Sequence, residues 1–254
     1  MSYTPDELMT VAAARLLKDE HVCFVGIGLP SAACNLARLT HAPRMTLIYE
    51  SGTIGTRPTV LPLSIGDGEL CTRALTTVSV PEIFRYWLQG GHVSIGFLSG
   101  AQVDRFANLN STVIGPYARP KVRLPGAGGA PEIATGCGEV FIIMRQSPRA
   151  FVSRLDFMTT LGHGDGGSHR ARLGFDTKGP TKVITDLCVM EPHPDTKELI
   201  VTSLHPGVTR ERVTQSTGWS IAFASHVAET APPTALELQV LRDLQERTAA
   251  AHAG

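Results

Sequence analysis

The chain has 254 residues, of which 43% are hydrophobic and 18% charged, and its 23 basic side chains balance 23 acidic ones. This length and composition predict a folded protein with a sizeable core and exclude an intrinsically disordered chain. The zero formal net charge argues against a nucleic-acid partner, because phosphate binding needs clustered basic charge. No apolar run reaches the length of a membrane span, so no membrane partner is expected.

The N-terminal segment and the cysteines both indicate a cytoplasmic location. Residues 1–7 are polar and partly acidic, unlike a secretory signal. The cysteines are odd in number, widely scattered and never spaced as C-x-x-C (Cys23, Cys34, Cys71, Cys137 and Cys188). We expect them to be reduced thiols.

The first fifty residues predict a β-α-β unit. An amphipathic helix over residues 6–18 precedes a buried strand over 21–28. A second helix follows from Ser31, which is a reasonable N-cap, to Leu39, and a second strand covers 45–50. This order is typical of a parallel sheet covered by helices.

The remaining chain alternates loops, short helices and strands. We expect an ordered loop region over 51–79, helices over 81–89, 209–216 and 234–251, and strands over 92–100 (extended by 101–105), 139–144, 182–191 and 198–204. A His-Pro-Asp turn joins the last two strands, so the sheet is expected to be mixed near its end. Thr234 and Glu237 form a capping box. Without repeats or a linker, we predict one α/β domain over residues 1–254, with a mostly parallel, partly mixed sheet.

Glu50 ends the predicted strand over 45–50 and leads directly into Ser51 and Gly52. Strands usually exclude glutamate, so an acid at this position has either a structural or a chemical purpose. In the structural interpretation the carboxylate caps a helix or pairs with an arginine such as Arg57. In the chemical interpretation it is a nucleophile toward an activated acyl group.

Two glycine motifs are candidate binding loops. Gly126-Ala-Gly-Gly129 can turn backbone N–H groups into a concavity beside a helix start, which suits an oxyanion or a phosphate; a tight turn without a ligand is the alternative. Gly26 and Gly28 resemble the start of a dinucleotide fingerprint, and Glu50 stands 22 residues after Gly28. The third glycine of that fingerprint is missing, which disfavours a dinucleotide site.

The loop over residues 162–169 contains His163, Asp165 and His169 among four glycines. These residue types bind metals, but the glycines favour a mobile, lid-like loop, so no metal site is predicted.

Five motifs occur in one order along the chain: Val25-Gly-Ile-Gly-Leu-Pro30, Leu47-Ile-Tyr-Glu-Ser-Gly52, Leu61-Pro-Leu-Ser-Ile-Gly-Asp67, Gly100-Ala-Gln-Val-Asp104 with Asn108-Leu-Asn110, and Pro125-Gly-Ala-Gly-Gly-Ala130. Together they resemble the β subunit of class I coenzyme A transferases over nearly the whole chain. The resemblance is strongest to the glutaconate CoA-transferase branch and, within it, to the β subunits of 3-oxoadipate CoA-transferases of aromatic degradation.

The resemblance implies a role for each motif. Glu50 corresponds to the catalytic glutamate, and its retention favours transfer over the hydrolysis or decarboxylation performed by relatives that have lost it. Gly126, Gly128 and Gly129 correspond to the loop that supplies a backbone N–H to the reacting thioester and binds CoA. Gly28, Ser51, Gly52, Gln102 and Asn110 are further candidates to line the site.

The resemblance also implies the reaction and the partners. CoA would move from succinyl-CoA to a 3-oxo acid, most closely 3-oxoadipate, through a glutamyl-CoA thioester and without a cofactor or a metal. Glutaconate and other acids stay open as acceptors, as does hydrolysis or decarboxylation. The partner would be an α subunit of related fold in an (αβ)n heteromer, and this chain shows no second related half.

Overall fold

The computed structural model describes residues 2–253 and divides the chain into two compact units. The first unit runs to Phe97 and includes the chain from Pro232 onward, and the second unit holds Leu98–Ala231. Both combine helices with strands, so the α/β class is confirmed. The organisation as a single domain stays a prediction.

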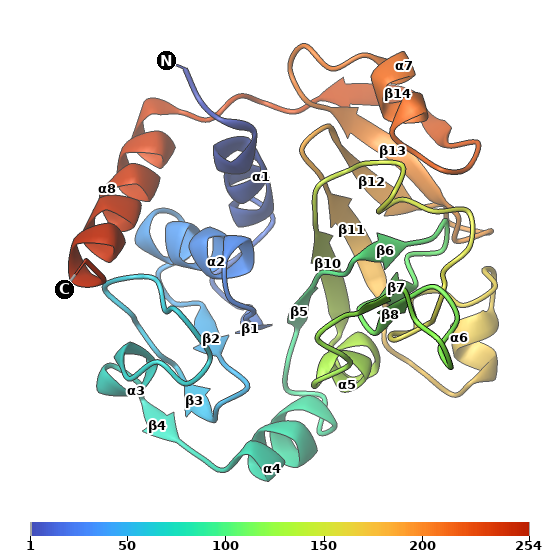
Figure 1. Cartoon of the computed structure of the whole chain (residues 1–254). Helices are drawn as coiled ribbons and strands as arrows, with labels where there is room; N and C mark the ends of the chain where they lie inside the picture. The colour runs from blue at the N-terminus through green and yellow to red at the C-terminus, as the bar shows by residue number, and fades with distance from the viewer. Residues whose placement is uncertain (1, 254) are drawn as a thin grey trace. The chain divides into compact units, whose positions relative to one another are not determined.

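The sheet of the first unit is built around β1 (Figure 1). Its strands, in spatial order, are β5 (Ile95–Leu98), β1 (Val22–Phe24), β2 (Thr46–Ile48), β3 (Thr53–Ile54) and β4 (Thr76–Thr77). Strand β1 is parallel to both β2 and β5, whereas β3 is antiparallel to β2 and to β4. The parallel core therefore confirms the predicted β-α-β unit.

Helices α1 (Pro5–Ala14), α2 (Leu29–Leu39) and α8 (Ala235–Ala251) contact one another in the first unit. Gly28, at φ +81°, is the N-cap residue of α2, so the prediction of Ser31 as N-cap is wrong. Ser31 instead turns inward, because its hydroxyl has a buried partner, Tyr49. The loop region over 51–79 includes the short helix α3 (Glu69–Thr72), and the helix predicted over 81–89 is α4 (Val80–Glu82) continued by a π-helix, Ile83–Leu88.

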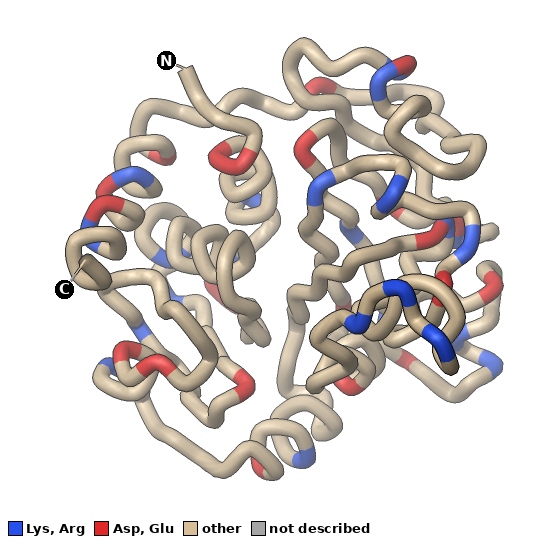
Figure 2. Tube along the Cα trace, in the orientation of Figure 1, with Lys and Arg blue, Asp and Glu red and all other residues tan. Residues whose placement is uncertain are grey.

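Two ion pairs fasten α8 to α1. Arg15 Nη2 lies 2.7 Å from Glu237 Oε2, and Arg242 Nε lies 2.6 Å from Glu7 Oε1. Each glutamate also completes the capping box of its own helix, with Thr234 or Thr4 at the N-cap. Figure 2 shows acidic and basic positions on both helices. Each carboxylate therefore accepts hydrogen bonds from the N-terminus of its own helix and also pairs with an arginine. Arg242 belongs to α8, and Arg15 directly follows α1.

The sheet of the second unit is mixed, as predicted. Its strands, in spatial order, are β14 (Ala222–Glu229), β13 (Leu199–Leu204), β12 (Cys188–Pro192), β11 (Pro180–Ile184) and β10 (Glu139–Ile143). Pairing is parallel for β10–β11 and β13–β14, and antiparallel for β11–β12 and β12–β13. The strand predicted over 182–191 is two strands that turn at 185–187, and β14 had no counterpart in the sequence prediction.

Two small hairpins and three short helices complete the second unit. Strands β6 (Gln102–Val103) and β7 (Leu109–Asn110) pair, as do β8 (Val113–Ile114) and β9 (Val122–Arg123), and the helices are α5 (Ala130–Gly136), α6 (His169–Arg172) and α7 (Arg210–Gln215). Residues 101–105 thus form a separate hairpin and do not extend β5, contrary to the prediction. Within residues 2–253, no helix combines the length and apolarity needed to cross a membrane.

The Arg15–Glu237 pair makes the stability of the first unit depend on pH. Burial opposes the charged carboxylate, but hydrogen bonds from Arg15 and Thr234 lower the pKa of Glu237 to about 2. A lowered pKa stabilises the fold above the unfolded-state value and loses that contribution as the pH falls toward the folded-state value. We expect Glu237→Gln to reduce the free energy of unfolding at pH 7 by about 2 kcal/mol.

Denaturant titrations of wild type and Glu237→Gln between pH 7 and pH 2 measure this effect. The difference in unfolding free energy should shrink as the pH falls from 4.5 to about 2. Glu246→Gln, on the exposed side of the same helix, is the control and should show no such trend. A difference between wild type and Glu237→Gln that does not vary with pH would contradict the ion-pair explanation.

Candidate active site

Glu50 stands at the tip of a tight turn between β2 and β3. The amide of Gly52 donates to Tyr49 O at 3.0 Å, and the amide of Tyr49 donates to Thr53 O at 3.1 Å. The turn therefore begins on a fully buried residue, Tyr49, whose hydroxyl lies 2.8 Å from Ser31 Oγ. Burial raises the pKa of Tyr49, so this hydroxyl stays neutral. A rigid base thus carries a half-buried Glu50.

The Glu50 side chain has no hydrogen bond or ion pair with any residue in the range 2–253. Arg57 is exposed, and its backbone amide bonds to Arg73 O. The structural interpretation, in which Glu50 pairs with Arg57 or caps a helix, is therefore wrong. A half-buried carboxylate without a partner is available to a ligand.

Gly52 is required by the backbone of this turn. Its φ of +108° is strained for other residues, and a Cβ would stand 2.0 Å from Val78 O. The amide of Val78 also donates to Gly52 O at 2.9 Å, so the segment before α4 holds the turn in place.

Two hydroxyl groups beside Glu50 are unsatisfied. Ser51 Oγ and Thr53 Oγ1 are buried and find no hydrogen-bond partner within residues 2–253. Buried polar atoms are almost always paired, so an exception at a candidate site suggests a partner that comes from outside the chain.

Gly28 lies at the same edge of the sheet as Glu50. Strands β1 and β2 are parallel with Phe24 opposite Ile48, so the turns that follow them share one edge. The Ser31–Tyr49 hydrogen bond further links the start of α2 to the Glu50 turn. Gly28, Glu50, Ser51 and Gly52 therefore lie at one edge of the sheet. Their role in lining a site stays a prediction. Ser31 was predicted only as a helix cap.

The glycine loop of the second unit is anchored at Ser111. Ser111 Oγ donates to Gly126 O at 2.8 Å, and the amide of Gly126 donates to Ser111 O at 2.9 Å. Gly126 and Gly128 have positive φ, and a Cβ at either would meet nothing within 4 Å. Gly129 is the N-cap residue of α5. The loop is therefore anchored at Gly126, and the space next to the Cα atoms of Gly126 and Gly128 is unfilled.

Gln102 and Asn110 are buried beside the turn to which this loop is anchored. Asn110 Nδ2 donates to Gln102 Oε1 at 2.7 Å. Asn110 Oδ1 accepts the amides of Thr112 and Val113, and Gln102 Nε2 donates to Asp156. Asn110 thus stabilises the turn that carries Ser111, and Gln102 links Asn110 to Asp156. The sequence analysis missed Ser111, although its place next to Asn108-Leu-Asn110 was a signal.

The loop over residues 162–169 is anchored, in contrast to the mobile loop that its glycines predicted. Asn108 Oδ1 accepts the amides of Gly162 and Gly164, and the ring of His163 is buried with Nε2 2.7 Å from Pro180 O. Burial lowers the pKa of His163. Within residues 2–253, no group of three His, Cys, Asp or Glu side chains is placed to hold a metal ion.

Comparisons with known proteins give matches over nearly the whole chain. A family model described as "Coenzyme A transferase" matches residues 7–216. The chain is 65% identical to one of the subunits of the 3-oxoadipate CoA-transferase of Pseudomonas knackmussii, over 99% of this chain and 96% of the relative. It is 33% identical to one of the subunits of the glutaconate CoA-transferase of Acidaminococcus fermentans, over 95% and 92%. The crystal structure of glutaconate coenzyme A-transferase from that organism superimposes with a TM-score of 0.91 at 31% identity, covering 98% of this chain and 97% of the other.

The Gly52 turn yields a stability prediction. We expect Gly52→Ala to reduce the free energy of unfolding by about 3 kcal/mol or more, because the new Cβ would meet Val78 O and strain the backbone. Gly28→Ala is the matched control, since its φ is also positive but its Cβ would have open space, and it should lose about 1 kcal/mol. Denaturant unfolding measures both; equal losses would show that the contact with Val78 is unimportant.

Proposed function

The chain belongs to the coenzyme A transferase family, and on that premise we propose that it is the β subunit of an enzyme that transfers CoA from succinyl-CoA to 3-oxoadipate. The observation that supports this proposal most directly is the Glu50 turn, which holds an unpaired carboxylate at the end of a buried strand. Such a group combines a fixed position with a free nucleophilic oxygen.

The chemistry follows from the carboxylate. Glu50 attacks the thioester carbonyl of succinyl-CoA, expels the CoA thiolate and forms a mixed anhydride. The thiolate then attacks the glutamyl carbonyl, which releases succinate and leaves a glutamyl-CoA thioester. The carboxylate of the acceptor attacks that thioester, CoA leaves again, and the thiolate finally attacks the acceptor's acyl carbonyl and frees Glu50. Each step exchanges one activated acyl bond for another, so the proposed reaction needs no metal or other cofactor.

The glycine loop is assigned to the negative oxygen that forms at each attack. The amide of Gly126 already donates to Ser111 O, whereas the amides of Gly128 and Gly129 have no partner among residues 2–253. Gly128 and Gly129 are therefore the candidate donors. One such donor, preorganised in a site from which water is excluded, typically lowers the barrier by about 3 kcal/mol.

The proposed partner is an α subunit of related fold in an (αβ)n heteromer. Both of the relatives described above are named as single subunits of larger enzymes, which supports this pairing. All five cysteines are free thiols in the described chain, which agrees with the proposed cytoplasmic location.

The nucleophile is tested by replacing it. We expect Glu50→Gln, in the complex with the α subunit, to lower the rate of CoA transfer by about 10⁴-fold or more, because a neutral amide cannot form the anhydride. Glu50→Asp should also abolish transfer, since its carboxylate falls short of the carbonyl. The wild-type complex should yield, after incubation with succinyl-CoA and borohydride, a modification that peptide mapping places on Glu50; modification elsewhere would refute the mechanism.

Hydrolysis on the same fold is the competing function. Release of free CoA from succinyl-CoA without an acceptor acid distinguishes the two. A transferase should release CoA far more slowly than it transfers it, whereas steady release at the transfer rate would favour a hydrolase.

The unsatisfied hydroxyl of Ser51 leads to a second test of the site. If a substrate supplies its partner, Ser51→Ala should raise the melting temperature of the free protein by about 2 °C and slow transfer by about 10- to 100-fold. Thr53→Val removes the neighbouring unsatisfied hydroxyl and should stabilise the protein without slowing transfer. A Ser51→Ala variant that keeps full activity would mean that this hydroxyl does not contact the substrate.

A further inference from the structure

The segment between Asp104 and Glu132 carries basic charge without acidic charge. Its 27 residues include four cationic side chains (Arg105, Arg119, Lys121 and Arg123) and no Asp or Glu, whereas the whole chain has 23 basic and 23 acidic side chains. Three of them fall within five residues at the β8–β9 hairpin, here called the basic hairpin (residues 113–123). Figure 2 shows the basic positions along it.

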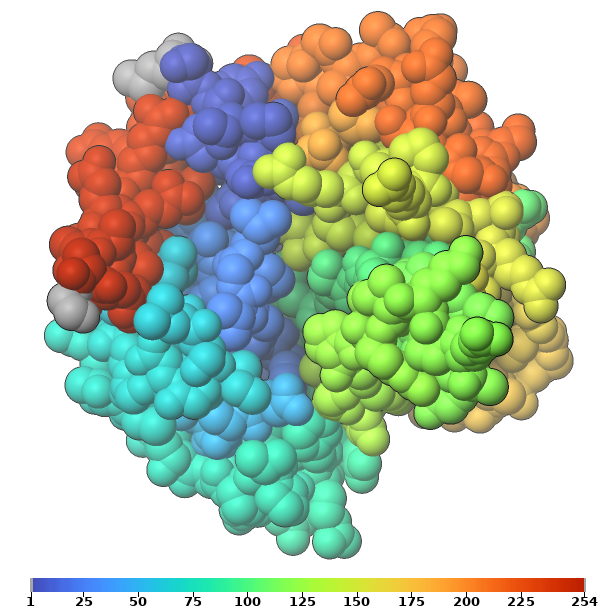
Figure 3. All heavy atoms as spheres, viewed as in Figure 1, coloured from blue at the N-terminus to red at the C-terminus, as the bar shows by residue number. Residues whose placement is uncertain are grey.

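The cations of the basic hairpin are exposed and unpaired. Arg119, Lys121 and Arg123 have no ion pair with any residue from 2 to 253. The carboxylate of Asp156 accepts hydrogen bonds from the backbone amide of Gly115 and the side-chain amide of Gln102, so it braces the base of the hairpin. The basic hairpin stands out as a green projection on the surface of the second unit (Figure 3). Such a group of cations suits an anionic ligand.

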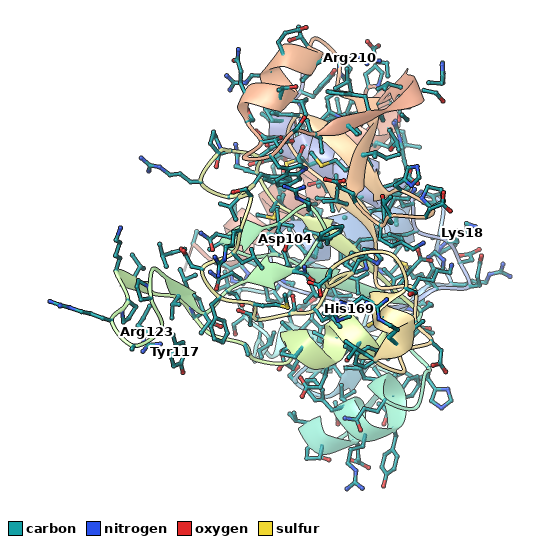
Figure 4. All side chains as sticks on the ribbon, turned by 90° about the vertical axis from the view of Figure 1, so that its right-hand side faces the viewer. Lys18, Asp104, Tyr117, Arg123, His169 and Arg210 are labelled. Atoms are coloured by element: carbon teal, nitrogen blue, oxygen red, sulfur yellow. The ribbon has the colours of Figure 1, made fainter. Side chains whose placement is uncertain are left out.

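Arg123 is held in place by aromatic side chains. Its guanidinium lies over the Tyr117 ring, 4.9 Å from the centroid, and Nη2 donates to Tyr117 O. The Tyr117 ring in turn stacks on Phe157 at 5.2 Å. Figure 4 shows Arg123 and Tyr117 together at one projecting end, well away from Arg210. A guanidinium fixed in this way loses little freedom when its remaining N–H groups bind a phosphate.

The basic hairpin continues directly into the glycine loop. The amide of Leu124, next to Arg123, donates to Thr112 O, and the amide of Gly126 donates to Ser111 O. Both strands of the hairpin are thus connected to the loop that carries Gly128. A ligand that reacts at this loop can place an anionic far end on the hairpin.

We propose that the basic hairpin binds the phosphate groups of coenzyme A, an inference that rests on the proposed function. CoA carries its thioester at one end and a diphosphate and a 3′-phosphate at the other, which matches a reactive loop followed by unpaired cations. Arg123 is suited to two-pronged binding of one phosphate, and Lys121 and Arg119 add point charge and further donors. Binding of this remote end helps to position the thioester at the reacting centre.

The test compares substrates with and without the nucleotide, using the αβ complex. KM and kcat are measured for succinyl-CoA, its 3′-dephospho form and succinyl-pantetheine. Lys121→Gln and Arg123→Gln should each raise KM for succinyl-CoA about tenfold, the double variant about a hundredfold, and neither should change KM for succinyl-pantetheine. A smaller effect on the dephospho substrate would assign part of the binding to the 3′-phosphate.

Arg210→Gln is the matched control. Arg210 is also exposed and lies over an aromatic ring, 4.8 Å from the centroid of Phe223, but on α7. It should leave KM for both thioesters unchanged. Arg123→Lys should recover part of the loss, because it keeps the charge but not the forked donors.

Three results would overturn the proposal. These are an equal rise in KM for succinyl-pantetheine, no rise for succinyl-CoA, and loss of the α subunit during purification, which would make the hairpin a subunit contact. If the wild-type complex transfers no CoA, the proposed function fails separately. In that case, calorimetric titration with 3′-phosphoadenosine 5′-phosphate still tests phosphate binding by the hairpin. Lys121→Gln and Arg123→Gln must bind this nucleotide more weakly than wild type and Arg210→Gln do.

Discussion

The approach of the Val78 backbone to Gly52 is the contact on which the candidate site depends. The carbonyl oxygen of Val78 leaves no room for a Cβ at position 52, and the amide of Val78 donates to Gly52 O. No side chain therefore fits between the two segments. The turn is therefore fixed at Gly52 by the backbone of Val78 and at its start by the buried side chain of Tyr49. Within the described residues, the Glu50 side chain has no hydrogen-bond or ion-pair partner. The position of the carboxylate is fixed by its neighbours, and its lone pairs stay free, as the proposed nucleophile requires.

In the second unit, the buried side-chain amides of two asparagines hold loop segments in place. Asn108 accepts two amides of the loop over 162–169, and Asn110 accepts two amides of the turn before β8. Loops rich in glycine lose more conformational entropy on folding than other segments, so they need such internal partners. The asparagines supply these bonds from the core. The glycine loop is held at Ser111, and the amides of Gly128 and Gly129 have no partner among residues 2–253, as the proposed oxyanion donor requires.

Some charged side chains of the protein form ion pairs between helices, and others have no ion pair. Acids and bases pair with each other where helices meet, as in Arg15–Glu237 and Arg242–Glu7. Among residues 2–253, Glu50 and the three cations of the basic hairpin have no ion pair. An ion pair that stabilises a helix contact is lost to chemistry, whereas an unpaired charge costs stability but remains available to a ligand. A half-buried unpaired carboxylate and a cluster of unpaired cations are therefore the positions at which a ligand is proposed to bind.

The sequence alone determined the features that depend on neighbours along the chain. The capping box of Thr234 and Glu237, the β-α-β unit and the delivery of Glu50 into a glycine turn all follow from local patterns, and the structure has each of them. The order of five motifs indicated the family, and the comparisons confirm it.

Only the tertiary structure decided the features that depend on distant partners. Ser31 does not cap the helix but forms a hydrogen bond with the buried hydroxyl of Tyr49. The loop over 162–169 is anchored because its amides donate to Asn108, 54 residues away from Gly162. The strand predicted over 182–191 becomes two because β11 and β12 fold back on each other. Whether Glu50 would pair with an arginine was also open until the fold was known. Local propensities are carried by each short segment, but a hydrogen-bond partner or an unpaired charge is defined only when remote segments meet.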